Sequence, residues 1–106
     1  MEIKIMLSEV YDKIPAGADN RISSRDLRIA TGLNARDLKR AVKALRENGA
    51  VICSCYDSEG GYYRPSSPEE AFQYVQIERQ RIQNEQRSLQ SAEAYVRDYE
   101  ESRAEK

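Results

Sequence analysis

Histidine and tryptophan are absent from this chain of 106 residues, and phenylalanine occurs once. Without histidine the chain lacks the commonest general base and metal ligand of enzymes. No glycine-rich phosphate loop follows a strand pattern, and the acidic residues are scattered over positions that we expect to face solvent. Since no nucleophile, base and oxyanion donors can be assembled, we expect no enzymatic activity, no cofactor and no small-molecule ligand.

Cysteine is scarce, with two residues in the whole chain. Cys53 and Cys55 lie two apart in a segment of strand composition, so their side chains point to the same face. No further cysteine or histidine is present to complete a zinc site. We interpret both as reduced, partly buried strand residues rather than as a metal or redox site.

Long apolar runs are missing, because no stretch approaches the ~18 residues that a spanning helix needs. We therefore expect no signal peptide and no membrane partner, and we take a cytoplasmic protein as the default. Charged residues make up 33% of the chain and hydrophobic ones 40%, so the apolar residues must be concentrated to form a core. They are concentrated before residue 66, which predicts a domain over residues 1–66 and an appended element over residues 67–106.

The net charge of −1 hides an asymmetry along the chain. Residues 21–46 carry eight bases and two acids, a balance of +6, whereas the chain from Glu69 onward carries six bases and nine acids, a balance of −3. At cellular salt, charges act over only about 8 Å. A basic face in the first segment can therefore attract a phosphate backbone despite the acidic C-terminal part.

The segment from Asn34 to Gly49 predicts an amphipathic helix with two chemically different faces. At 3.6 residues per turn, its apolar stripe comprises Leu38, Ala41, Val42 and Leu45. The other side carries Arg36, Lys39, Arg40 and Lys43. One face is suited to a protein core and the other to an anion, although a basic helix face can also be an ordinary solvated surface.

Helix start and stop signals place two helices before this one. The apolar spacing over residues 3–14 predicts a first helix that ends at Pro15. Ser23 with Asp26 predicts the cap of a second helix over residues 24–30, which buries Leu27 and Ala30. Thr31 to Leu33 forms a turn in which Gly32 takes a positive φ, and Asn34 caps the third helix. Two capped helices joined by a glycine-containing turn predict a helix-turn-helix.

A β-hairpin is predicted after the third helix. Residues 50–56 are rich in strand formers, Asp57 to Gly61 has turn composition, and residues 62–64 return as a second strand. We expect Tyr62 or Tyr63 to enter the core, and residues 21–23 to form a very short strand. Asp57 and Glu59 at the tip repel phosphate, so Arg64 is the better candidate for a DNA contact from this hairpin.

Ser67, Pro68 and Glu70 form a further helix start, and one helix of up to ~37 residues is allowed after it. Its apolar residues follow a seven-residue repeat, which indicates half of a coiled-coil seam. The residues assigned to dimerisation are Phe72, Val75, Ile82, Leu89 and Val96.

The first turns of this helix, with Phe72, Tyr74, Val75 and Ile77, are expected to pack on the domain. Later positions need a partner or will fray, because a domain of this size cannot cover a helix about 55 Å long. We favour homodimerisation through the helix, and attachment to a different protein is the alternative.

At residues 23–65 the sequence resembles the winged helix domain of the biotin-operon repressor type. The resemblance rests on Ser23 to Leu27, Thr31 to Asn34, Leu38 to Gly49 and Gly60 to Pro65. It implies an α+β winged helix-turn-helix, with three helices and a β-hairpin wing, followed here by the long C-terminal helix. It also implies that the helix from Asn34 enters the major groove and that the tip at Asp57 to Gly61 approaches the neighbouring backbone. A glutamine-rich helix stands where that repressor has its ligase domain, so no biotin chemistry is implied.

We therefore expect sequence-specific binding of double-stranded DNA by a small dimeric transcription regulator, similar in size to winged helix proteins of phages and plasmids. The DNA-binding residues assigned on these grounds are Arg25, Asn34, Arg36, Lys39, Arg40, Lys43, Arg46 and Arg64. Base contacts fall to Arg36, Lys39 and Arg40, while Arg25, Lys43 and Arg46 contact phosphates. The alternative is an interaction adaptor that docks a larger assembly through its C-terminal helix.

Overall fold

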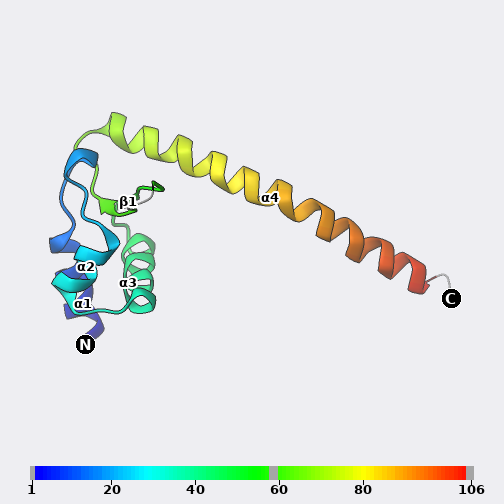
Figure 1. Ribbon diagram of the computed structural model, residues 1–106, viewed down its shortest axis with the longest axis horizontal. Coiled ribbons are helices and arrows are strands. Elements are labelled where there is room, and N and C mark those ends of the chain that lie inside the picture. The colour runs from blue at the N-terminus through cyan, green and yellow to red at the C-terminus, as the bar shows by residue number, and fades with distance from the viewer. Residues whose placement is uncertain (1, 58–59, 105–106) are drawn as a thin grey trace. The chain divides into compact units, whose positions relative to one another are not determined.

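The computed structural model describes residues 2–57 and 60–104. The described chain is mostly helical, with a small two-stranded antiparallel hairpin and a long C-terminal helix, so its class is α+β (Figure 1). It divides into two compact units, Met1–Tyr74 and Val75–Lys106, which we call the N-terminal and C-terminal units. None of the helices in the described residues is both long and apolar enough to cross a membrane.

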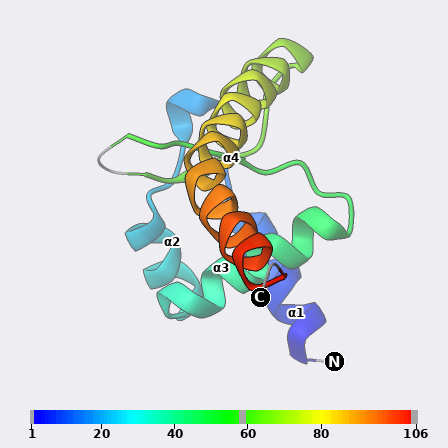
Figure 2. The same ribbon diagram turned by 90° about the vertical axis from the view of Figure 1, so that its right-hand side faces the viewer.

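Three helices form most of the N-terminal unit: α1 (Glu2–Lys13), α2 (Ser24–Thr31) and α3 (Ala35–Glu47). They are gathered against one another in Figures 1 and 2, with α1 in contact with both α2 and α3. The buried core consists of Val10, Ile14, Leu27, Leu38, Ala41, Val42, Leu45 and Ile52. The apolar stripe predicted for the third helix is thus its buried face.

The predicted caps of α2 and α3 are confirmed. The Ser23 Oγ accepts a hydrogen bond from the Asp26 N–H at 3.0 Å, and the Asn34 Oδ1 accepts one from the Asp37 N–H at 2.8 Å. Each bond satisfies a backbone donor that a helix start leaves free. Gly32 ends α2 with a φ of 75°, the left-handed conformation expected of it.

The prediction that Ala30 is buried is wrong. Ala30 is exposed, whereas Leu27 is fully buried. The covered side of α2 runs from Leu27 to the half-buried Thr31, whose Oγ1 donates to the Leu27 carbonyl at 2.7 Å. A spacing of four residues keeps these two on one face of the helix and leaves Ala30 beside it.

The hairpin is shorter than its composition predicts. It consists of β1 (Cys53–Ser54) and β2 (Tyr62–Tyr63), paired antiparallel with Cys53 opposite Tyr63. Residues before Cys53 do not join the strand. The Ile52 carbonyl accepts hydrogen bonds from the Arg46 guanidinium, and the backbone of Arg64, which follows β2, bonds to Pro15 and Gly17. Tyr63 is only 7% exposed, which confirms that one tyrosine of the pair enters the core.

A third segment adds to the hairpin beside β2. Ile22 and Tyr62 exchange two backbone hydrogen bonds of 3.0 and 2.9 Å, just after the short 3₁₀ helix η1 (Ala18–Asn20). The backbone comes so close at this point that a Cβ on Gly61 would lie 2.7 Å from the Ile22 carbonyl oxygen. Gly61 also has a φ of 122°, which side chains disfavour. The hairpin therefore reaches the segment before α2 only because residue 61 is glycine.

The long helix α4 (Pro68–Ala104) begins where the sequence predicts, with the Ser67 Oγ accepting from the Glu70 N–H at 3.2 Å. The prediction that the Glu70 carboxylate completes a capping box on Ser67 is wrong. The carboxylate accepts instead from the Ser66 N–H at 2.9 Å and the Ala18 N–H at 3.1 Å. These two hydrogen bonds, led by that from Ser66, lower the pKa of the Glu70 carboxyl. Glu70 thus joins the start of α4 to the loop before α2.

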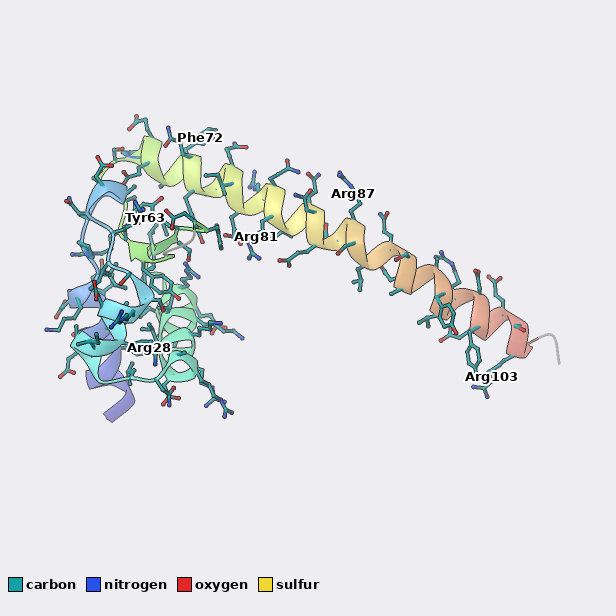
Figure 3. The ribbon with its side chains drawn as sticks, in the orientation of Figure 1. Arg28, Tyr63, Phe72, Arg81, Arg87 and Arg103 are labelled. Carbon is teal, nitrogen blue, oxygen red and sulfur yellow. The ribbon has the colours of Figure 1, made fainter. Side chains whose placement is uncertain are left out.

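The prediction that Phe72 packs on the domain is wrong. Its side chain is 63% exposed and projects outward from the first turns of α4 (Figure 3). Val75 and Ile77 are exposed as well, whereas Tyr74 is half-buried. The start of α4 is held by hydrogen bonds to Glu70 and Ser67 rather than by an apolar face.

Replacing Gly61 with alanine tests the close approach to Ile22. We expect Gly61→Ala to lower the free energy of unfolding by roughly 2 kcal/mol or more, because strain at a positive φ adds to a backbone clash. Gly32→Ala is the matched control, since Gly32 also has a positive φ but a Cβ there meets nothing within 4 Å. Urea unfolding followed by circular dichroism measures both, and equal losses would contradict the role of the contact.

The Glu70 hydrogen bonds predict an acid-dependent stability. Because the folded-state pKa of Glu70 lies below its ordinary value of 4.5, its contribution is present above that pH and is lost as the pH falls through the folded value. Glu70→Gln should lower the urea midpoint at pH 7, and the gap to the wild type should narrow on acidification. Glu69→Gln, at the exposed neighbouring position, should leave the midpoint unchanged. A constant gap between wild type and Glu70→Gln would count against this linkage.

Candidate nucleic-acid interface

The exposed side of α3 carries a row of basic side chains, which we call the α3 basic row. It consists of Arg36, Lys39, Arg40 and Lys43, all of them exposed. Their spacing of three and four residues keeps them on one side of the helix. The opposite face supplies half of the core residues of the unit. Burial of that face directs the basic row toward solvent.

Two further arginines lie on the neighbouring helix. Arg25 and Arg28 of α2 are exposed, and they line a depression of about 460 Å³ together with Ile29, Gly32 and Leu33. Figure 3 labels Arg28 within the group of helices. Ile29, which follows Arg28, is 71% exposed, a feature that the sequence reasoning missed. The signal in the sequence was an isoleucine two positions after Leu27, which places it on a different face of the short helix α2.

None of these six bases forms an ion pair with a residue that the structure describes. The three ion pairs within the described residues are Arg21–Asp57, Arg81–Glu78 and Arg81–Glu85. Within the described residues, no hydrogen bond or ion pair uses the side-chain donors of Arg25, Arg28 or the α3 basic row. Guanidinium and ammonium groups in this state are the usual ligands of phosphate oxygens and of guanine edges.

Arg46, assigned to phosphate from the sequence, is used within the fold. Its Nε and Nη2 donate to the Ile52 carbonyl at 3.0 and 2.7 Å, and its Nη2 also donates to the Ser54 Oγ at 2.8 Å. The side chain thereby ties the end of α3 to β1. Its sequence signal was the same as that of the α3 basic row, since Arg46 also lies on an exposed helix position.

Arg64 likewise serves the fold. Its Nε donates to the Ile14 carbonyl at 2.7 Å, and its guanidinium carbon lies 4.8 Å from the centre of the Tyr11 ring. Its backbone N–H and carbonyl bond to Pro15 and Gly17, each at 2.7 Å. Arg64 therefore joins the end of β2 to the end of α1, and its side chain is not a free cation.

One acidic residue of the hairpin loop is paired with a base. The Asp57 carboxylate accepts from the Arg21 Nη2 at 2.8 Å, and its other oxygen accepts from the Gly60 N–H at 2.9 Å. This pair is partly exposed, so its effect on stability is small, but it offsets the negative charge of Asp57, which would otherwise repel a phosphate. Glu59, the second acid counted there, lies outside the described residues.

Asn34 is exposed at the start of α3, and its Oδ1 is occupied by the cap described above. Its amide N–H₂ group and the second lone pair of Oδ1 are left to meet a ligand. Asn34 therefore caps α3, in addition to the DNA contact assigned to it from the sequence.

The two cysteines are free thiols, with Cys53 buried and Cys55 half-buried. Burial raises the pKa of both thiols, and it raises the pKa of the neighbouring Tyr63 to about 12. Both cysteines therefore stay protonated at neutral pH, which makes them weak nucleophiles and weak metal ligands. No cluster of three or more metal-binding side chains occurs in the described part of the chain.

All five residues assigned to dimerisation are exposed on α4: Phe72, Val75, Ile82, Leu89 and Val96. Tyr95 and Tyr99 add to the exposed apolar surface of the C-terminal unit. These side chains therefore form an apolar surface that the described residues leave uncovered. Apolar residues that stay in water add little to the stability of an isolated helix.

Comparison with known proteins found no relative of this chain. No family model matches the chain, and neither the curated proteins nor the solved structures include a match.

The structural use of Arg46 can be separated from that of the α3 basic row by stability measurements. Arg46→Ala should lower the free energy of unfolding by about 1 kcal/mol, because the Ile52 carbonyl loses a charged donor. Lys43→Ala, one turn earlier on the same helix, should change it by less than about 0.5 kcal/mol. Thermal unfolding of both variants measures these changes in stability. Equal effects would argue against the stabilising role of the hydrogen bonds from Arg46 to Ile52 and Ser54.

Proposed function

We propose that the N-terminal unit is a winged helix module that binds double-stranded DNA with α3 as its recognition helix. The observation that carries the proposal is the α3 basic row, four exposed bases without ion-pair partners in the described residues. A helix of 13 residues has the length and width to enter a major groove. Arg25 and Arg28 extend the positive surface beyond α3.

The order of the elements supports a winged helix. The helices α1, α2 and α3 are followed by β1 and β2, and the Ile22–Tyr62 pairing adds a short strand segment between α1 and α2. The three-residue turn at Gly32 joins α2 to α3 as in a helix-turn-helix. The loop between β1 and β2 takes the place of the wing, where pairing with Arg21 offsets the charge of Asp57.

The exposed basic side chains form two groups, one suited to base edges and one suited to phosphates. Arg36, Lys39 and Arg40 lie in the first half of α3, the part of a recognition helix that contacts base edges. Arg40 fits bidentate donation to guanine O6 and N7. Arg25 and Lys43 flank them and suit phosphate contacts, whereas Arg46 and Arg64 stay with the fold. A small transcription regulator is the role that this arrangement supports best.

Loss of two bases from α3 should weaken DNA binding strongly. We expect the Arg36→Ala, Arg40→Ala double variant to bind a duplex of about three helical turns at least tenfold more weakly than the wild type, because on a sequence without the cognate bases both guanidinium groups bind backbone phosphates. The slope of log K against log salt should become shallower by about 2. Fluorescence anisotropy with a labelled random-sequence duplex at several salt concentrations measures both quantities.

The matched control removes the same charge from the C-terminal unit. Arg79 and Arg87 are exposed on α4, and Figure 3 labels Arg87. Arg79→Ala with Arg87→Ala should leave the affinity and the salt slope unchanged. An equal loss in both double variants would mean that net charge alone drives association, and binding that does not respond to salt would refute the proposal.

The adaptor hypothesis has one specific observation in its favour. Phe72 is exposed at the start of α4, beside a depression of about 580 Å³ lined by Pro68, Glu69, Phe72 and Gln73. Large exposed aromatic side chains are typical of protein-binding surfaces. Absence of DNA binding in the experiment above would favour this function.

A further inference from the structure

The C-terminal half of α4 carries a complete coiled-coil seam over two consecutive heptads. Leu89 and Val96 continue the seven-residue repeat, and Ala92 and Tyr99 occupy the positions three residues after them. All four positions lie on one face of a helix that is uncovered, with Leu89, Val96 and Tyr99 56%, 53% and 58% exposed. Earlier in α4 the corresponding positions after Val75 and Ile82 are Glu78 and Glu85, so the seam is complete only in this part.

A depression of about 430 Å³ lies on this face, lined by Leu89, Ala92, Glu93, Val96, Arg97 and Glu100. Its first four residues have the spacing i, i+3, i+4 and i+7, which is the outline of the hole that receives a side chain in knobs-into-holes packing. Ala92 has the smallest side chain of the four and leaves the middle of the hole open. A β-branched side chain of moderate size fits such a hole.

The charged residues that flank the seam differ in sign at its two ends. Glu85 occupies the seam position before Leu89, and Arg103 occupies the one after Tyr99. In the single chain Glu85 pairs with Arg81 at 2.5 Å, and the Arg103 guanidinium lies 6.0 Å from the Tyr99 ring centre. The seam positions are therefore apolar in the middle, with an acidic side chain at one end and a basic side chain at the other.

A second copy in parallel would place each seam residue opposite itself. Glu85 would then face Glu85 and Arg103 would face Arg103, with Glu78 facing Glu78 further along. Like charges in seam positions destabilise a coiled coil and select another orientation.

An antiparallel second copy removes these conflicts. With the two-fold axis beside residue 94, Glu85 faces Arg103 of the second copy, Leu89 faces Tyr99 of the second copy, and Ala92 faces Val96 of the second copy. The symmetry repeats each pairing in reverse, which gives six layers, four apolar and two of opposite charge. Of the charged residues, only Glu93 approaches its own counterpart, at the exposed rim, where solvent and salt weaken the repulsion.

We propose that the C-terminal half of α4 pairs with the same segment of a second copy of this chain, antiparallel and centred near residue 94. The charges at Glu85 and Arg103 set the orientation, and Leu89, Ala92, Val96 and Tyr99 provide the apolar contact. The opposite charges at the two ends of the seam identify a second copy as the partner, because the face is complementary to itself.

The pairing does not depend on DNA binding, and the spacing that it predicts for DNA rests on the proposed function. Residue 75 lies 19 positions before the axis in each copy, so the two helices leave their N-terminal units about 57 Å apart at 1.5 Å per residue. Neighbouring major grooves on one face of DNA are only about 34 Å apart. The distance between the two copies of residue 75 therefore exceeds the distance between neighbouring major grooves.

Disulfide cross-linking of the full chain tests the orientation. Leu89→Cys and Tyr99→Cys are prepared as separate variants, mixed, oxidised mildly and analysed by non-reducing electrophoresis, with peptide mass spectrometry to locate the link. We expect a link between residues 89 and 99 in the mixture and none in either variant alone. In the antiparallel pair the two copies of residue 89 are about 15 Å apart along the axis, beyond disulfide reach. Wild-type protein controls for Cys53 and Cys55.

Charge reversal tests the register by sedimentation. Glu85→Lys and Arg103→Glu should each weaken dimerisation about tenfold, since each changes two symmetric pairs from attraction to repulsion. The two changes together should restore the dissociation constant to within about threefold of the wild type. Glu101→Lys, on the outer side of the helix, is the matched control and should have no effect.

A link from Leu89→Cys to itself, a monomeric wild-type chain at all concentrations tested, or a combined variant that is no better than the single ones would overturn the pairing. The same variants distinguish failure of the pairing from failure of the proposed DNA binding, because none of these substitutions lies in α3. Loss of DNA binding with an intact antiparallel dimer would reject the DNA-binding role alone. A monomer that still binds DNA through α3 would reject the pairing alone.

Discussion

The burial of one face of α3 is the constraint on which the N-terminal unit depends. Leu38 and Val42 are almost completely covered by the helices around them, and these contacts fix the rotation of α3 about its own axis. A helix held in this way must present its opposite face to solvent. The core and the α3 basic row therefore follow from the same periodicity, and neither can be moved without moving the other.

A small core leaves the connecting segments to be held by hydrogen bonds. Arg46, Arg64 and Glu70 bond to backbone groups at Ile52, Ile14 and Ala18, where the chain is irregular and its polar groups need partners. The basic residues of the N-terminal unit thus fall into two sets, one that bonds within the fold and one without an ion pair to a described residue. Of the eight bases between residues 21 and 46, Arg21 and Arg46 belong to the first set, and the positive surface consists of the other six.

The C-terminal unit is governed by the lack of a core. A single helix cannot cover its own apolar stripe, so Leu89, Val96 and Tyr99 remain in contact with water unless another helix is present. Apolar burial favours association in either orientation, and only the arrangement of charge distinguishes the two. Glu85 and Arg103 make that distinction because they occupy seam positions, where the two helices come closest.

The sequence by itself determined the helices, their caps at Ser23, Asn34 and Ser67, the turn at Gly32, the buried stripe of α3 and the entry of one tyrosine of the Tyr62–Tyr63 pair into the core. These features depend on interactions within a few residues or on periodicity along one element, which the sequence displays directly. Only the tertiary structure decided that Phe72 is exposed, that Ala30 lies outside the core and that Gly61 must let Ile22 approach. It also separated Arg46 and Arg64 from the free bases, because the carbonyl that each one meets comes from a segment the sequence does not place beside it.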